Sequence, residues 1–242
     1  MADQGATKLS MQERIESVAR ADNRWQVPLA LPASTVVLAR PTTGGTAHAE
    51  SQFEVVMLRR ASSMKFAAHM AVFPGGKVDP VDYSGPDPYV ACAIREVYEE
   101  VGIEVDQLIR WDHWITPEIE PMRYDVQFYL AILEPGTEGQ LRTTEADEML
   151  WLTPQEGHQR SIDGTLRMLR PTQVVLSDLA QASNVDQLVE LAAAREIFPR
   201  LPRPSLNEDK SIRWDLVDAS TMQVAYVDVG AARLESTGEA PS

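Results

Sequence analysis

The chain has 242 residues, of which 44% are hydrophobic and 24% charged, and its formal net charge is −14. This length and composition are typical of a soluble globular protein with one sizeable core and some appended segments. The acidic balance argues against a nucleic-acid-binding surface, which needs clustered lysine and arginine residues.

The only cysteine, Cys92, excludes an intrachain disulfide. It lies in an apolar stretch of a predicted helix, where a buried cysteine acts as a small hydrophobic residue. Residues 1–20 contain no apolar segment like that of a secretory signal, and no apolar run approaches the roughly 18 residues of a membrane span. We therefore expect a protein of the reducing cytoplasm.

The first half of the chain alternates between strand-like and turn-like stretches. A polar leader at 1–29 contains a short amphipathic helix at 11–22. A loop rich in Gly and Thr spans 41–52, and a second irregular loop, rich in Pro and Gly, spans 74–88. β-Branched and apolar residues predict strands at 34–40, 53–60, 70–73, 108–115, 124–133 and 148–152.

One helix in the middle of the chain has clear start and stop signals. Asp87 can cap it, Pro88 suits its first turn, and Gly102 is a typical stop. Apolar residues at helical spacing predict a face packed on the core, and these are Val90, Ala93, Ile94, Val97 and Val101.

Two helical patterns follow near the end of the chain, at 164–182 and 184–198. Pro171 is expected to kink or break the first, and Asn184 is a suitable cap for the second. With Arg195 and the stretch 199–205, these helices either close one side of a pocket or form a dimer contact.

The order of these elements predicts an α/β fold, an α/β/α sandwich around a mixed β-sheet with an N-terminal leader and extra C-terminal helices. The core is expected at 30–160. A helical extension packed on it is expected at 161–229, followed by a flexible tail at 230–242.

Three glutamates crowd the last turns of the central helix. Glu96, Glu99 and Glu100 are three and four residues apart, so their carboxylates lie on neighbouring faces. At about 5 Å and an effective dielectric near 20, each pair repels by about 3 kcal/mol. The helix dipole adds to the cost, because the C-terminal end of a helix favours cations.

Arg95 can reach Glu99 but cannot neutralise three charges, whereas a divalent cation can. Hard carboxylate oxygens suit Mg²⁺ or Mn²⁺, and no Cys or His is placed to suggest zinc. The Gly75–Gly76 pair allows the backbone to approach closely, so that a carbonyl could join the metal's ligands. The alternative is an ordinary solvated acidic helix face.

These residues resemble the signature of the Nudix hydrolases, which is a Gly, five residues, Glu, seven residues, then Arg-Glu-apolar-x-Glu-Glu-x-Gly-apolar. The stretch REVYEEVGI at 95–103 matches the second half, and Gly76 matches the opening glycine. The spacing from Gly76 to Arg95 is five residues longer than in the family. Counting back from Arg95, Asp87 takes the place of the first Glu and is expected to cap the helix and pair with Arg95. The inserted stretch 77–86 is either a substrate lid or a surface loop.

The resemblance implies a metal-dependent hydrolase of a nucleoside diphosphate linked to another group. It implies Glu96, Glu99 and Glu100 as metal ligands, together with the carbonyl of Gly75. Glu96 is the candidate general base within the signature, and Arg95 is expected with it among the catalytic residues. Glutamates in or beside loops are alternatives, or else ordinary surface acids, and these are Glu118, Glu120, Glu145 and, favoured among them, Glu148.

A second motif upstream resembles the coenzyme A diphosphatase branch of the family. Arg60-Ala61 and the Phe-Pro-Gly-Gly at 73–76 match that motif in register, but Lys65 replaces its second Arg and His69 replaces its Gly. Lys keeps the charge and loses the bidentate geometry of Arg. The resemblance implies that Arg60, Lys65, Gly76 and Lys77 contact the substrate; otherwise the cations are solvated charges at a strand edge.

Three functions therefore compete. The first is a diphosphatase for coenzyme A or acyl-CoA, the second a diphosphatase for ADP-ribose or another dinucleotide, and the third a Nudix-like module that binds nucleotides without turnover. All three have a small-molecule partner, and a homodimer is compatible with each. The tryptophans at 111, 114 and 151 are interpreted as core residues rather than a base-stacking surface.

Overall fold

The computed structural model describes residues 9–42, 52–64 and 67–226. Its chain forms two compact units. The larger unit comprises Pro32–Trp114 and Val126–Ile197 among the described residues, and the smaller comprises the described parts of Met1–Leu31, Ile115–Asp125 and Phe198–Ala232. Among the described residues, none of the helices has the length and hydropathy needed to cross a membrane. The loop expected at 41–52 and the tail expected at 230–242 fall largely or wholly outside the described residues.

A β-sheet forms the centre of the larger unit. Five strands follow one another in the order β5-β6-β1-β2-β3, while β4 pairs with β1 and β7 pairs with β2. The short β3 leads into the turn at 73–76, and the two glycines of that turn are the first residues of β4. The strands are β1 (Ala30–Pro41), β2 (Phe53–Arg60), β3 (Ala71–Val72), β4 (Gly75–Lys77), β5 (Ile109–Ile115), β6 (Arg123–Ile132) and β7 (Ala146–Leu152).

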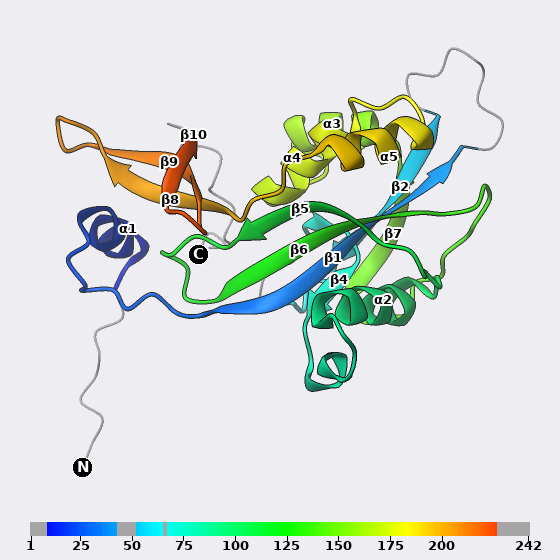
Figure 1. The fold of residues 1–242 in the computed structure, drawn as a ribbon, viewed down its shortest axis with the longest axis horizontal. Helices are drawn as coiled ribbons and strands as arrows, with labels where there is room; N and C mark the ends of the chain where they lie inside the picture. Colours follow the sequence, from blue (N-terminus) through cyan, green and yellow to red (C-terminus); the bar gives the residue numbers. More distant parts are fainter. Residues whose placement is uncertain (1–8, 43–51, 65–66, 227–242) are drawn as a thin grey trace. The chain divides into compact units, whose positions relative to one another are not determined.

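Helices cover both faces of this sheet, which confirms the predicted α/β sandwich. Helix α2 (Pro88–Val101) lies on one face, and α3 (Pro154–Ile162), α4 (Arg170–Leu179) and α5 (Val185–Ala194) lie on the other (Figure 1). The cap and the stop of α2 are those predicted. The carboxylate of Asp87 accepts hydrogen bonds from the N–H groups of Tyr89 and Val90, and Gly102 takes a left-handed conformation at the other end.

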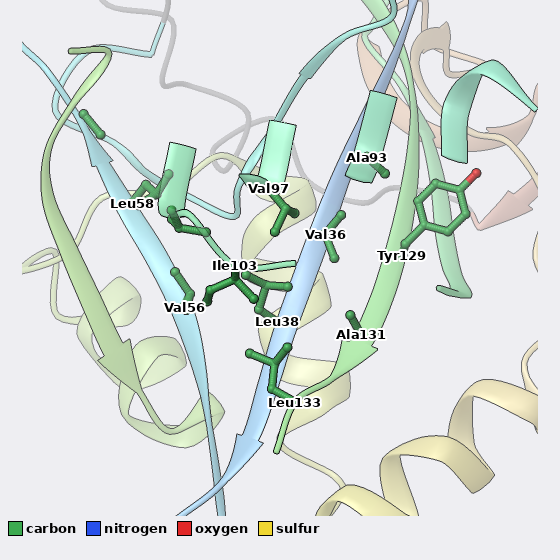
Figure 2. Packing of buried hydrophobic residues seen from close by; sticks show 12 residues of the cluster. Val36, Leu38, Val56, Leu58, Ala93, Val97, Ile103, Tyr129, Ala131 and Leu133 are labelled. Atoms are coloured by element: carbon green, nitrogen blue, oxygen red, sulfur yellow. The ribbon is translucent and has the colours of Figure 1, made fainter. Parts of the chain in front are cut away.

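The core between the sheet and α2 follows the alternation of the strands. Val36 and Leu38 from β1 and Val56 and Leu58 from β2 pack with Val97 of α2 in one buried cluster (Figure 2). Because successive side chains of a strand alternate between faces, Val55 and Met57 belong to the face covered by α3–α5. This alternation also decides on which face each polar residue at the strand ends lies.

The smaller unit contains α1 (Met11–Arg20) and the strands β8 (Arg200–Leu206), β9 (Ile212–Asp218) and β10 (Gln223–Tyr226), paired in that order. The segment 115–125 joins them. Trp25 donates from Nε1 to the carbonyl of Glu118 at 2.7 Å, and Arg203 forms an ion pair with the carboxylate of Glu118 at 2.7 Å.

The C-terminal region differs from the prediction. The extension expected at 161–229 is helical only as far as α5, and residues 200–226 contain β8–β10. The stretch RLPRPSL pairs over its whole length with β9, because alternating apolar residues and a tight turn favour a hairpin. The leader, expected as a separate appendage, contacts these strands through α1. Pro171 stands in the first turn of α4, so the pattern expected to begin at 164 starts as a helix only at Arg170.

Arg195 lies at the end of α5 in a buried network of the larger unit. Its Nε donates to the carbonyl of Trp111 at 2.9 Å, and its Nη2 donates to Asp178 of α4 at 2.7 Å. The guanidinium stacks over the Trp111 ring and lies 3.7 Å from Asp112, whose side chain is 1% exposed. Arg195 therefore attaches α4 and α5 to β5, and its role here is structural.

We predict that Arg195→Ala lowers the free energy of unfolding by about 3 kcal/mol, because Asp178 and the carbonyl of Trp111 both lose the charged group that donates to them. Urea denaturation measures this change. Arg167→Ala is the control, since Arg167 is exposed, and it should change stability by less than about 0.5 kcal/mol. Equal effects of the two substitutions would contradict the structural role of Arg195.

Candidate metal and diphosphate site

Hydrogen bonds fix the turn at 73–76 against β1, and β1 against the start of α2. Thr35 Oγ1 donates to the carbonyl of Pro74 at 2.8 Å, and Ser34 Oγ donates to the carbonyl of Tyr89 at the start of α2 at 2.7 Å. Gly75 has a φ of +156°, and a Cβ on it would overlap the carbonyl oxygen of Ser34. Only glycine allows this approach, which places the backbone of the turn beside the glutamates of α2.

Glu100 is the most deeply buried of the three glutamates, with 8% of its surface exposed. Its Oε2 accepts a hydrogen bond from the N–H of Gly75 at 2.9 Å. Burial raises the pKa of Glu100 to about 8, while the Gly75 hydrogen bond acts in the opposite direction. The negative charge of Glu96 raises this pKa further, so the two carboxylates are close enough to interact.

Glu96 lies against the second glycine of the turn. A Cβ on Gly76 would overlap the Glu96 carboxylate, so the backbone and the side chain share a space that any larger residue would fill. Burial raises the pKa of Glu96, and Arg95 opposes that rise by donating from Nη1 to Glu96 Oε1 at 2.8 Å. Glu96 is thus a desolvated carboxylate with a fixed orientation.

Glu99 lies at the outer side of this group, with 56% of its side chain exposed, and accepts from Arg95 Nη1 at 3.0 Å. Within the described part of the chain, no group of three or more His, Cys, Asp or Glu side chains is arranged to hold a metal ion. The donors nevertheless fit Mg²⁺ or Mn²⁺ in chemistry. They are hard oxygens, two are desolvated, and the Gly76 backbone leaves the space beside Glu96 that a side chain would fill.

Arg95 is held by an acid that the sequence analysis did not identify. Asp82 accepts from Arg95 Nε at 3.0 Å and from Nη2 at 2.8 Å, and Nη2 also donates to the carbonyl of Lys77. The Arg95 guanidinium lowers the pKa of Asp82, whose side chain is 2% exposed. Asp82 belongs to the 3₁₀ helix η1 (Pro80–Ser84), which lies within the inserted stretch 77–86.

This pairing corrects the expectation for Asp87, which caps α2 as predicted, whereas the acid bound to Arg95 is Asp82. Counting back from Arg95 placed the five extra residues before the acid. Counting forward from Gly76, five residues lead to Asp82, so the extra residues follow it. The forward count was the signal that could have identified Asp82. The insertion thus carries a buried residue and is more than a surface loop.

The cost of placing acids at the C-terminal end of α2 is offset by a segment from elsewhere in the chain. The N–H groups of Gln140 and Arg142 donate to the carbonyls of Val101 and Glu100, both at 2.8 Å. The guanidinium of Arg142 packs against Gly102, so a cation stands at the helix end, where the dipole favours one. The local sequence of the helix contains no sign of this compensation.

The strand β2 ends in two arginines that lie on opposite faces of the sheet. Arg60 continues the row of Val56 and Leu58 that packs toward α2, and its charge lowers the pKa of Glu100. Arg59 lies on the other face, where it pairs with Glu148 at 2.9 Å. The structure therefore does not bring Glu148 to the three glutamates. The prediction that favoured Glu148 among the loop acids as a general base is wrong.

The remaining candidates are placed as follows. Lys77 contributes its carbonyl to Arg95, and its side chain is exposed. Lys65 lies outside the described residues. His69, in the place of a motif glycine, has a φ of +61°, a conformation that favours glycine. Glu118 and Glu120 belong to the smaller unit.

Two further expectations concern buried residues. Cys92 is buried, its Sγ lies 3.2 Å from the carbonyl of Lys77, and burial raises its pKa to about 12, so it is a packing residue of α2 as predicted. Trp111 and Trp114 are core residues, with 0% and 4% of their surfaces exposed. Trp151 is partly buried and packs beneath the guanidinium of Arg40.

We predict that Asp82→Asn lowers the free energy of unfolding by about 3 kcal/mol, because Arg95 loses the charge of its buried partner. Asp87→Asn should change it by less than about 0.5 kcal/mol, since Asn is an equally good helix cap. Urea denaturation of both variants compares the two acids. A larger loss in Asp87→Asn would mean that the partner of Arg95 is Asp87.

A second prediction concerns the contact between Gly76 and Glu96. Gly76→Ala should lower the free energy of unfolding by about 1–3 kcal/mol, because the added Cβ forces the Glu96 carboxylate to move. Thermal denaturation measures this. Gly85→Ala is the matched control, because a Cβ on Gly85 meets no atom within 4 Å, and it should be close to neutral. A neutral Gly76→Ala would refute the close contact.

Known proteins were compared with this chain. The family model described as the NUDIX domain matches residues 37–170, more than half of the chain. Putative nudix hydrolase 7 of Caenorhabditis elegans is 26% identical over 209 residues, which cover 71% of this chain and 67% of that protein. The crystal structure of a NUDIX hydrolase from Alicyclobacillus acidocaldarius has the same fold. Its TM-score is 0.59 at 23% identity, and the match covers 68% of this chain and 97% of that chain.

The matched segment includes β2, the glycine turn, η1, α2 and β7, and so contains the three glutamates, Arg95, Asp82 and Arg60, whereas Ser34 and Thr35 lie just before it. The resemblance seen in the signature is therefore shared by the whole domain around it. This chain belongs to the Nudix family of hydrolases, enzymes that act on pyrophosphate bonds.

Proposed function

We propose that this chain is a Mg²⁺- or Mn²⁺-dependent diphosphatase whose substrate is coenzyme A or an acyl-CoA. The products are 3′,5′-ADP and a 4′-phosphopantetheine moiety. The observation that carries the metal dependence is the pair of desolvated carboxylates, Glu96 and Glu100, beside a turn that only glycine can form. The coenzyme A substrate rests on the upstream motif around Arg60 and the turn at 73–76.

In this proposal Glu96, Glu99 and Glu100 hold the metal together with the carbonyl of Gly75. A bound divalent cation neutralises phosphate charge and lowers the pKa of the water that it binds. Glu96 accepts the proton of the attacking water. Arg95 is the positioning residue for Glu96, and it is itself oriented by Asp82 through two hydrogen bonds. Glu148 has no role here, because it pairs with Arg59 on the other face.

The substrate's diphosphate is placed beside the same turn. The backbone of Gly76 allows close approach, and Arg60, Lys65 and Lys77 supply positive charge to the phosphates. Arg60 is supported by its place in the row that faces α2. For Lys65 the support is the sequence motif alone, and for Lys77 it is the exposure of a side chain next to Gly76.

Two other functions are separated from this one by experiment. A diphosphatase for ADP-ribose or another dinucleotide would use the same metal site with a different leaving group, and a panel of diphosphates ranked by kcat/KM distinguishes it. A module that binds nucleotides without turnover would bind ADP and release no product. We favour an enzyme because all three glutamates of the signature are present.

We further propose that the protein works in the cytoplasm, where its single buried thiol stays reduced, and that it forms a homodimer. Light scattering on the purified full chain gives the oligomeric state.

We predict that the wild-type protein with Mg²⁺ converts coenzyme A to products with the masses of 3′,5′-ADP and 4′-phosphopantetheine. EDTA should abolish the reaction, and Mn²⁺ should raise the melting temperature. Glu96→Gln and Glu100→Gln should each lower kcat by about 10²-fold or more, because each removes a metal ligand, and Glu96→Gln also removes the base.

Glu104→Gln is the control, because Glu104 is an exposed acid just beyond α2, and it should keep wild-type activity. Hydrolysis of other diphosphates without hydrolysis of coenzyme A would disprove the substrate and leave the enzyme class intact. Glu100→Gln turning over as fast as wild type would disprove the metal site.

A further inference from the structure

The pairing of β2 with β7 is irregular where the two strands reach the site. Arg59 lies opposite Glu148, but Arg60 lies opposite Ala146, so Asp147 is an extra residue on β7. This is a β-bulge, a feature that redirects side chains at the ends of strands and next to active sites. The carboxylate of Asp147 points to Arg59 and accepts a hydrogen bond from Arg59 Nε at 3.0 Å.

The bulge decides what faces Arg60. In a regular ladder the residue opposite Arg60 would be Asp147, and the two opposite charges would form a close cross-strand pair. With the bulge, the opposite residue is alanine, and Glu145 is an acid of this region that forms an ion pair with the Arg60 guanidinium. Its Oε2 lies 3.7 Å from Arg60 Nη2.

The two partners of this pair differ in their surroundings. The Arg60 side chain is 18% exposed, whereas the Glu145 side chain is 57% exposed. The Glu145 backbone is fixed, because its carbonyl accepts from the N–H of Ala61 at 2.8 Å. An ion pair of this length with one solvated partner contributes little stability, whereas arginine binds phosphate oxygens with two parallel hydrogen bonds. A phosphate beside Arg60 can therefore replace Glu145.

Both charges also act on Glu100, one of the proposed metal ligands. Arg60 and Glu145 each influence Glu100, in opposite directions, so the pair lies at the edge of the site rather than apart from it. The negative charge of Glu145 weakens the attraction of this edge for any anion. Only an anion that binds Arg60 more strongly than Glu145 does can displace it.

We propose that Glu145 is a specificity-determining residue that holds Arg60 and competes with the substrate's phosphate for it. The inference rests on the proposed function, because it takes the substrate to be an anionic diphosphate. Glu145 then lowers the affinity of the site for phosphate-containing ligands, so that only those that bind Arg60 strongly are retained. It takes no part in the chemical step.

The test uses ADP as the probe and isothermal titration calorimetry in Mg²⁺ and again in EDTA. Glu145→Gln should lower the Kd for ADP on the order of 3- to 10-fold in both conditions, because one competing charge is removed. It should lower the KM of the diphosphate substrate similarly and leave kcat unchanged. Arg60→Gln should raise the Kd, and adding Glu145→Gln to Arg60→Gln should then have no effect, since the competition requires both residues.

Asp147→Asn is the matched control. It also removes one negative charge, and Asp147 is only two residues from Glu145, but the carboxylate of Asp147 contacts Arg59 rather than Arg60. It should leave the Kd for ADP unchanged. Thermal denaturation of Glu145→Gln should match wild type, since Glu145 is exposed.

Each other result overturns the proposal. A loss of kcat at unchanged Kd would make Glu145 a general base, and a weaker Mn²⁺ affinity would make it a metal ligand. If the wild-type protein is active and Glu145→Gln binds ADP with an unchanged Kd, the ion pair between Glu145 and Arg60 has no part in binding. If the wild-type protein neither binds ADP nor hydrolyses any diphosphate, the proposed function fails and this inference fails with it.

Discussion

The guanidinium of Arg95 connects all parts of the candidate site. Two of its nitrogens bind Asp82 of η1, one of these also binds the carbonyl of Lys77, and the third donates to Glu96 and Glu99. These partners raise the pKa of Arg95, so its charge is permanent. Because one planar group binds them all, the loop, the short strand β4 and the helix take up a single arrangement.

The glycine turn supplies the other half of this geometry. Its backbone lies so close to β1 and to Glu96 that side chains are excluded, and its N–H reaches Glu100. Glu100 remains buried because the row of Val97 and Val101 packs the same helix on the sheet. The desolvation that raises the pKa of Glu100 thus comes from ordinary core packing.

Strand alternation decides which charged residues take part. Arg59 and Arg60 are neighbours in the chain, yet one faces α2 and the other faces the opposite helices. Glu148 follows Arg59 for the same reason. The bulge at Asp147 shifts this pattern by one residue, and it is what places Ala146 opposite Arg60 and leaves Glu145 at the site's edge.

The sequence by itself determined the central helix, its caps and the three carboxylates, because helical spacing, capping and the Nudix signature are local patterns. It also determined most strands, and the boundaries of β2 agree with those predicted.

The sequence could not determine the partner of Arg95, because an insertion can lie on either side of an acid and both counts are possible. It could not determine the faces of Arg60 and Glu148, because these depend on register and on a bulge between strands that are far apart in the chain. The strands β8–β10 were missed for the same reason, since short strands are stabilised by their neighbours rather than by their own residues. Tertiary structure alone decided which charges meet, because pairing depends on distances between segments that no local pattern contains.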